Sequence, residues 1–197
     1  FDVGNVLLNL HYQPFIQYLG RAGVDMADLP RWLSQVDLEG HERGDVSGEA
    51  LLGRIAGMAT RPLDLAELRA HWLSMFEPWD EMFTLASGLK ADYRVYLLSN
   101  IGDMHWAHLD ALYGLDTLVH GACASFRVGA IKPHVDIYRK AESMFDLDPA
   151  ATVFLDDLLP NVAGARECGW HAIHHTDAGL TRSQLRALGV RLPAPFT

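Results

Sequence analysis

Three apolar, β-prone runs in the second half of the chain constrain its fold more than any other feature. They are YRVYLLSN at residues 93–100, TVFLDD at 152–157 and WHAIHHT at 170–176, and each ends in polar residues. Two stretches with helical spacing of apolar side chains, residues 134–145 and 161–168, lie between the later runs. Strands that alternate with helices predict a doubly wound α/β fold built on a parallel sheet.

Residues 14–90 carry a different pattern. Apolar side chains recur there every three or four residues in short segments, which predicts a run of helices and offers no strand candidate. Pro30 suits the first turn of one helix, and Ser47 suits the cap of another. The opening run FDVGNVL predicts a first strand that ends at Asp2.

These patterns divide the chain into two domains. We predict an α/β core formed by residues 1–10 and 91–197, with a helical cap domain of residues 11–90 inserted into it. The chain begins at Phe1 without a methionine, so a few residues are expected to precede it and to complete the first strand. At the other end, Thr181 and Gln184 form a capping-box pattern, which predicts a last helix that starts near Thr181.

The composition indicates which kinds of molecule the protein can bind. Apolar residues make up 49% of the chain and charged residues 21%, as in globular proteins, and no segment approaches the ~20 apolar residues of a membrane helix. A net charge of -9 without clusters of Lys and Arg argues against nucleic acid. Two cysteines, Cys123 and Cys168, predict buried thiols in a reducing compartment. We therefore expect a cytoplasmic monomer or weak homodimer that binds a small molecule, with no membrane partner.

Polar residues gather where the predicted strands end. In open α/β sheets, ligands bind at the carboxyl ends of the strands. The residues at those ends are Asp2, Ser99, Asn100, Asp156 and Asp157, and the short motif IKP adds Lys132. Three carboxylates at one edge would repel one another unless a cation lay among them, and a hard divalent ion with oxygen ligands, most simply Mg²⁺, meets that need.

Such a set of groups suits phosphoryl transfer. A metal on one side, a lysine on the other and hydroxyl or amide donors beneath can hold a phosphoryl group and stabilise its negative charge. Asp2, partly neutralised by the metal, can attack phosphorus and form an aspartyl phosphate. Pro133 restricts Lys132 to extended backbone, which helps to fix the ammonium group.

Four motifs in this order resemble those of the haloacid dehalogenase superfamily, and the resemblance covers essentially the whole chain. The motifs are Asp2-x-Gly4-Asn5-Val6, Leu98-Ser99-Asn100, Lys132-Pro133 and Asp156-Asp157, with the helical cap between the first two. The stretch HERGDVSGEA at residues 41–50 is similar to the branch of capped bacterial phosphatases that includes an α-glucose-1-phosphate phosphatase.

The resemblance implies a Rossmann-like core and a role for each matched residue. Asp2 would be the nucleophile and a metal ligand, and the Gly4 carbonyl would be a further ligand. Ser99 and Asn100 would bind phosphate, and Lys132 would bridge the nucleophile and the phosphate. Asp157, with Asp156 beside it, would complete the Mg²⁺ site. The cap would close over a small phosphorylated metabolite, such as a sugar phosphate, and exclude water.

Gly4 departs from the family pattern. Many family phosphatases carry a second aspartate two residues after the nucleophile, where it serves as general acid and then as general base. Glycine cannot do this, and general acid catalysis contributes roughly 10²- to 10⁴-fold. His41 and Glu42 of the cap are the candidates to replace the missing acid, and His41, Glu42 and Arg43 are the candidates to contact substrate from the cap.

Two other functions fit parts of the pattern. A carbon-halogen hydrolase of the same superfamily also uses an aspartate nucleophile but needs no metal, and Asp156 with Asp157 would then be two carboxylates without a cation. A non-catalytic protein that binds metal or phosphate with the same fold would explain Gly4. The phosphomonoesterase accounts for all four motifs.

Overall fold

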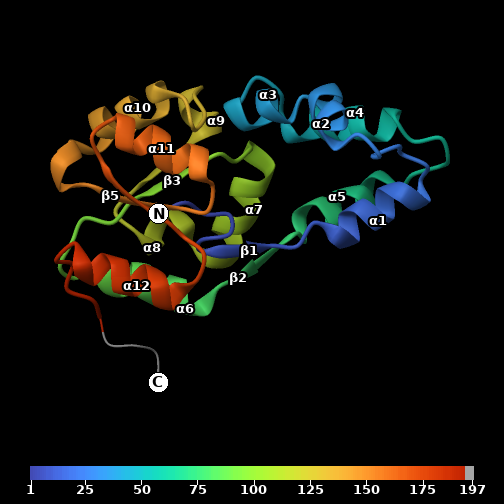
Figure 1. The fold of residues 1–197 in the computed structure, drawn as a ribbon. Coiled ribbons are helices and arrows are strands. Elements are labelled where there is room, and N and C mark those ends of the chain that lie inside the picture. Colours follow the sequence, from blue (N-terminus) through green and yellow to red (C-terminus); the bar gives the residue numbers. More distant parts are fainter. Residues whose placement is uncertain (194–197) are drawn as a thin grey trace.

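The computed structural model describes residues 1–193 of the chain. Figure 1 shows two parts, an α/β core and a helical cap that projects from one side of it. Among the described residues, no helix is long and apolar enough to cross a membrane. Both cysteines are free and buried, as the sequence predicts.

The sheet of the core is built from two parallel strand pairs and the first residues of the chain. The pairs are β3 (Leu97–Ser99) with β4 (Ala122–Ala124) and β5 (Val153–Asp156) with β6 (His171–His174). Residues 1–2 lie between the pairs, because Leu98 N–H donates to the Phe1 carbonyl and Asp2 N–H donates to the Leu155 carbonyl, both at 2.9 Å. The predicted α/β fold with parallel strands is confirmed.

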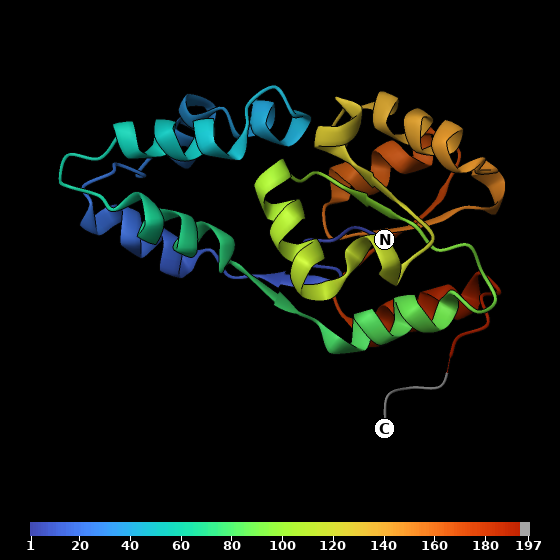
Figure 2. The same ribbon diagram turned by 180° about the vertical axis from the view of Figure 1, so that it is seen from behind.

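Helices cover both faces of this sheet. In Figures 1 and 2, α6 and α12 lie on one side and α10 and α11 on the other. The helices of the core are α6 (Asp80–Leu89), α7 (Asp103–Tyr113), α8 (Leu115–Leu118), α9 (Ser125–Val128), α10 (Val135–Phe145), α11 (Leu159–Glu167) and α12 (Ala178–Ala187), with a 3-10 turn at Pro149–Ala151. Helices α10, α11 and α12 pack directly on the strands, and α6 buries its apolar face in one cluster with Val3 and Leu97, as expected for a doubly wound fold.

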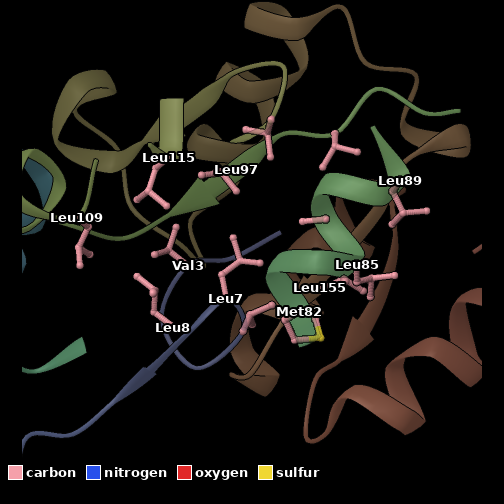
Figure 3. Close-up of a cluster of buried hydrophobic side chains, with 14 of the residues drawn as sticks. Val3, Leu7, Leu8, Met82, Leu85, Leu89, Leu97, Leu109, Leu115 and Leu155 are labelled. Carbon is pink, nitrogen blue, oxygen red and sulfur yellow. The ribbon is translucent and has the colours of Figure 1, made fainter. Parts of the chain in front are cut away.

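Helix α6 belongs to the core, although the sequence pattern places it in the cap. Met82, Leu85 and Leu89 pack with Val3 and Leu97 in one buried cluster, which Figure 3 shows around the start of the chain. The core therefore resumes before residue 91. Periodicity identifies a helix with one apolar face, but it does not say which part of the molecule covers that face.

The last helix also differs from its prediction. It begins at Ala178, and Asp177 caps it by accepting a hydrogen bond from the Leu180 N–H at 2.7 Å. Thr181 is fully buried, and its hydroxyl lies 2.7 Å from His175 Nδ1. The capping-box prediction was wrong. Asp177 is as good an N-cap residue as threonine, and because it caps the helix four residues earlier, Thr181 lies inside the helix.

The cap has a hydrophobic core of its own. Its helices are α1 (Gln13–Arg21), α2 (Leu29–Val36), α3 (Leu38–Arg43), α4 (Gly48–Gly57) and α5 (Leu65–Leu73). They bury a cluster that includes Phe15, Trp32, Leu51 and Trp72. Ser47 caps α4 as predicted, because its hydroxyl accepts from the Ala50 N–H.

A two-stranded antiparallel ribbon connects the cap to the core. It pairs β1 (Leu8–Leu10) with β2 (Phe76–Pro78), and both strands are short. No strand is predicted for residues 76–78, since Pro78 and the length of the segment hide it. Strand β1 precedes the cap helices and β2 follows them, so the ribbon fixes the two points at which the chain passes between core and cap.

The cap also touches the core through helix α3 and the first residue of α4. The Ser125 hydroxyl donates to the Glu42 carbonyl at 2.5 Å, and Gly48 N–H donates to Asp103 Oδ1 at 2.9 Å. The ring of His41 lies directly against Gly102, where a side chain would have no space. These contacts hold one edge of the cap close to the carboxyl ends of the strands.

Candidate active site

A buried lysine joins two carboxylates at the carboxyl edge of the sheet. Lys132 Nζ lies 2.9 Å from Asp2 Oδ2 and 2.6 Å from Asp156 Oδ2. All three residues are buried, so water screens their charges weakly. Burial opposes the charge on Lys132, but the two carboxylates outweigh it, and the pKa of Lys132 is raised. The lysine is therefore held as an ammonium beside the predicted nucleophile.

Asp156 has no free lone pair. Its Oδ1 accepts from Leu158 N–H at 2.8 Å and from Asn161 Nδ2 at 3.0 Å, and its Oδ2 accepts from Lys132 Nζ and from Asn161 Nδ2 at 3.1 Å. Two hydrogen bonds to each oxygen use the full acceptor capacity of a carboxylate. Asp156 thus holds Lys132 in place, and its role as a metal ligand stays a prediction. Asn161, in the first turn of α11, is a site residue that the motifs do not reveal.

Asp157 has a different surrounding. Its Oδ2 accepts from Asn5 Nδ2 at 3.0 Å, and the Asn5 carbonyl oxygen of the same amide accepts from Leu10 N–H at 3.1 Å. Asn5 has a φ of 50°, a left-handed conformation that asparagine adopts more readily than most residues. Asn5 therefore holds the loop after Asp2 against Asp157.

The acidic groups form an oxygen-rich site. A carboxylate oxygen from each of Asp2, Asp156 and Asp157 lies within 4.8 Å of the other two. Burial raises the pKa of Asp2, with Lys132 opposing and Asp156 adding to the shift, and burial and Asp2 raise the pKa of Asp157. The surplus of negative charge over the one ammonium fits a divalent cation held by Asp2, Asp157 and the Gly4 carbonyl, since Mg²⁺ prefers oxygen ligands.

Ser99 and Asn100 follow β3 into the same site. Ser99 is buried, and its hydroxyl favours the charged form of the Asp2 carboxylate, which opposes the rise in its pKa. The Asn100 amide pairs with the backbone of Lys132, donating to its carbonyl at 3.0 Å and accepting from its N–H at 2.8 Å. The side chain of Asn100 therefore fixes the lysine loop, and its contact with phosphate stays a prediction.

Glu42 brings an acid from the cap to the site. It lines the same cavity as Asp2, Gly4 and Lys132. Burial raises the pKa of Glu42 to about 7; Lys132 opposes this rise, and Asp2 and Glu39 add to it. A carboxyl group with that pKa can both donate and accept a proton near neutral pH.

The other two cap candidates have different surroundings. His41 Nδ1 lies 2.8 Å from the Val46 carbonyl oxygen, so Nδ1 carries the hydrogen, and the ring is buried against Gly102. Arg43 Nε pairs with Asp45 at 2.6 Å and its Nη1 pairs with Glu39 at 2.9 Å. Arg43 is not among the described residues that line the cavity.

Comparisons with known proteins agree with this fold. A sesquiterpene phosphatase, astK of Aspergillus oryzae, is 27% identical over 190 residues, which cover 95% of this chain and 94% of that protein. A D-ribitol-5-phosphate phosphatase of Bacteroides thetaiotaomicron is 24% identical over 197 residues, covering 95% and 96%. These two relatives span nearly the whole chain, cap included.

A solved structure matches both parts of the fold. A HAD family enzyme of Bacteroides thetaiotaomicron has a TM-score of 0.82 at 24% identity, covering 94% of this chain and 95% of its own. The same enzyme in complex with magnesium and inorganic phosphate has a TM-score of 0.77. The family model of haloacid dehalogenase-like hydrolases matches residues 1–169, and the chain belongs to this family of hydrolases.

Proposed function

We propose that the protein is a Mg²⁺-dependent phosphomonoesterase that works through an aspartyl phosphate on Asp2. The observation that carries the proposal is the buried Asp2, held 2.9 Å from an ammonium group and next to the half-buried Asp157. Two relatives named as phosphatases and a similar fold solved with magnesium and phosphate support it. Mg²⁺ on Asp2, Asp157 and the Gly4 carbonyl would neutralise charge on the phosphoryl oxygens.

The reaction has two steps at phosphorus. In the first, a carboxylate oxygen of Asp2 bonds to phosphorus, the bond from phosphorus to the alcohol oxygen breaks, and that oxygen takes a proton. In the second, water attacks phosphorus and loses a proton, and the bond to Asp2 breaks, which releases phosphate and restores the carboxylate. Lys132 and the Ser99 hydroxyl face the anionic oxygens during both steps.

Glu42 supplies the proton in the first step and takes one back in the second. Gly4 offers no side chain for this purpose, and a Cβ there would meet nothing within 4 Å, so no nearby group crowds the position. Glu42 lies in the same cavity, and its pKa of about 7 suits both directions of transfer. The cap thus contributes a group to the chemistry when it lies against the core.

The two alternatives explain less of the site. A metal-independent dehalogenase would have no use for Asp157, which stands free of the lysine network. A protein that only binds phosphate would have no need for a buried carboxylate beside an ammonium group. Hydrogen-bond donors to the phosphate oxygens are enough for binding.

The test measures phosphate release from p-nitrophenyl phosphate with Mg²⁺, with EDTA and by Asp2→Asn. We expect metal-dependent release that Asp2→Asn abolishes, because the amide cannot attack phosphorus. Glu49→Gln, an exposed cap residue away from the cavity, is the control and should keep full activity. Folded wild-type protein that binds Mg²⁺ and releases no phosphate would favour the binding protein, and release that EDTA leaves unchanged would contradict the metal site.

A further inference from the structure

One cavity of about 490 Å³ runs from the nucleophile into the cap. Its two ends differ in chemistry. The core end holds the carboxylates, amides and ammonium of the site, including Asp2, Asn5 and Lys132. The cap end is lined by aromatic and aliphatic side chains, among them Phe15, Met26, Trp32, Leu33, Trp72 and Met75. The volume suits a small organic molecule.

The cap wall offers few polar partners. Glu42 is its one charged side chain among the described residues that line the cavity, and it lies at the phosphoryl end. The remaining polar atoms of the wall are chiefly the Tyr12 hydroxyl, His41 Nε2 and the indole N–H groups of Trp32 and Trp72, and the last three have no hydrogen-bond partner among the described residues. These few groups can pair with some hydroxyl groups of a polyol, but the aliphatic and aromatic remainder of the wall would leave the others without partners, which costs free energy for each group.

His105 strengthens the apolar character. Its Nε2 donates to the Trp72 carbonyl at 2.8 Å, and its ring stacks on Trp72 with centroids 4.4 Å apart. Burial lowers the pKa of His105 to about 4, so the ring is neutral at physiological pH. The one histidine that the core contributes to this part of the cavity therefore acts as an aromatic surface.

Apolar side chains continue to the rim of the cavity. Tyr12 is 49% exposed, Leu29 44% and Leu158 54%, and all three line it. Tyr12 and Leu29 come from the cap and Leu158 from the loop after Asp157, so apolar surface faces solvent on both sides of the opening. Exposed apolar groups around a concave site mark a surface that an apolar ligand covers.

We propose that the substrates are phosphate monoesters of apolar alcohols, aliphatic or aromatic, with the hydrocarbon group in the cap and the phosphoryl group on Asp2. This inference rests on the proposed phosphomonoesterase activity and replaces the sugar phosphate expected from the sequence. The cap selects by burying hydrocarbon, and the core reads only the phosphoryl group. The product is then an alcohol more hydrophobic than its phosphate.

The first test compares substrates on the wild-type enzyme with Mg²⁺. We expect kcat/KM to rise along the series ethyl, butyl, hexyl and octyl phosphate by up to about fourfold for each added methylene that becomes buried. α-Glucose-1-phosphate and ribitol-5-phosphate should fall below butyl phosphate. Turnover that is flat along the series and highest for a sugar or polyol phosphate would overturn the inference while leaving the phosphatase intact.

A matched pair of variants links the preference to the cavity. Leu29→Gln puts a polar group at the opening, and we expect the ratio of kcat/KM for octyl over ethyl phosphate to drop at least fivefold. Leu65→Gln makes the same change at a cap leucine that is 58% exposed and outside the cavity, and should leave the ratio unchanged. Equal ratios in Leu29→Gln and wild type would count against the assignment.

A binding measurement separates this inference from the catalytic proposal. Asp2→Asn protein with Mg²⁺ is titrated with octylphosphonate and with ethylphosphonate, and tryptophan fluorescence reports occupancy because Trp32 and Trp72 line the cavity. We expect at least tenfold tighter binding of the octyl compound. If no substrate is turned over, the phosphatase proposal fails, yet this preference still tests the apolar site; equal affinities would refute it.

Discussion

Asp156 and Asp157 are neighbours in the sequence, yet their carboxylates have different surroundings. Asp156 is fully buried and saturated by Lys132, Asn161 and the Leu158 N–H, whereas Asp157 is half-buried and accepts one side-chain hydrogen bond, from Asn5. Adjacent residues at a strand end point in different directions. One carboxylate therefore faces the lysine, and the other is the one that we propose as a ligand of the cation.

Replacing each aspartate by asparagine should separate these roles. Asp156→Asn removes a partner from a buried ion pair, so we expect a loss of about 3–5 kcal/mol in the free energy of unfolding. Asp157→Asn should change stability little in EDTA but raise the Mg²⁺ concentration for half-maximal activity by about tenfold or more. Urea unfolding and Mg²⁺ titrations of activity check both; a larger metal effect from Asp156→Asn would reverse the assignment.

The pKa of Glu42 predicts how activity should depend on pH. The charged groups around it are Lys132, Asp2 and Glu39. A general acid must be protonated, so kcat/KM for butyl phosphate should fall as the pH rises through about 7. Glu42→Gln should lose this fall and lower kcat/KM about 100-fold, with a smaller loss for p-nitrophenyl phosphate, whose leaving group needs no proton.

The control for this change is Glu49→Gln. Glu49 is an exposed acid on α4 that pairs with Arg69 at 2.5 Å, and it lies outside the cavity. Its variant should keep the wild-type pH profile. If Glu42→Gln also keeps that profile, the proton comes from another group.

Among elements, helix α3 depends on a glycine in the core. A Cβ on Gly102 would collide with the ring of His41, which is buried and bonded to Val46. Gly102→Ala should therefore cost about 1–3 kcal/mol in the free energy of unfolding and lower activity, because α3 also carries Glu42. Gly53→Ala, in the exposed middle of α4 with nothing near its Cβ, should stabilise by about 0.5–1 kcal/mol. Thermal unfolding of both variants checks the opposite signs.

Helices and strands could be predicted from the sequence where the spacing of apolar residues fits only one type of secondary structure. Strands β3, β5 and β6 lie within their β-prone runs, and Pro30 and Ser47 stand at helix starts as expected. The strand Ala122–Ala124 was missed because three small residues carry no β-prone pattern. The sequence predicts the helix α6 correctly but assigns it to the cap, since the spacing of its apolar residues does not show which domain covers them.

For the site, too, the motifs predict which residues take part, and the packing of the folded chain determines which groups each of them contacts. The four motifs identify Asp2, Ser99, Lys132 and the two aspartates. Asp2, Ser99, Lys132 and Asp157 line one cavity, and Asp156 is buried behind Lys132. The parts that could not be predicted depend on how side chains are oriented in the folded chain, such as Asn161 of α11, which donates to both carboxylate oxygens of Asp156 five residues before it. The apolar cavity is another such part, because the helical spacing of Phe15 and Trp72 predicts only that they belong to a core, and the packed cap places them both in that core and along the cavity.

At the scale of the whole molecule, metal binding should stabilise the folded chain. The three acidic residues meet only after residues 1–2 and β5 have come together, so the unfolded chain holds no such site. At about 100 times its dissociation constant, Mg²⁺ would add about 2.7 kcal/mol, which raises Tm by roughly 5–10 °C for a chain of this size. Calorimetry of Asp157→Asn is the comparison, and an equal rise there would place the ion elsewhere.

The position of residues 1–2 in the middle of the sheet sets the order in which the protein can assemble during synthesis. Asp2, the proposed nucleophile, is synthesised before the residues that flank this segment in the sheet, Leu98 and Leu155. The cap closes on itself between β1 and β2 and can fold while the ribosome is still making the core. A chain that stops before β5 would therefore carry the proposed nucleophile, the cap and Ser99, and still have no complete site.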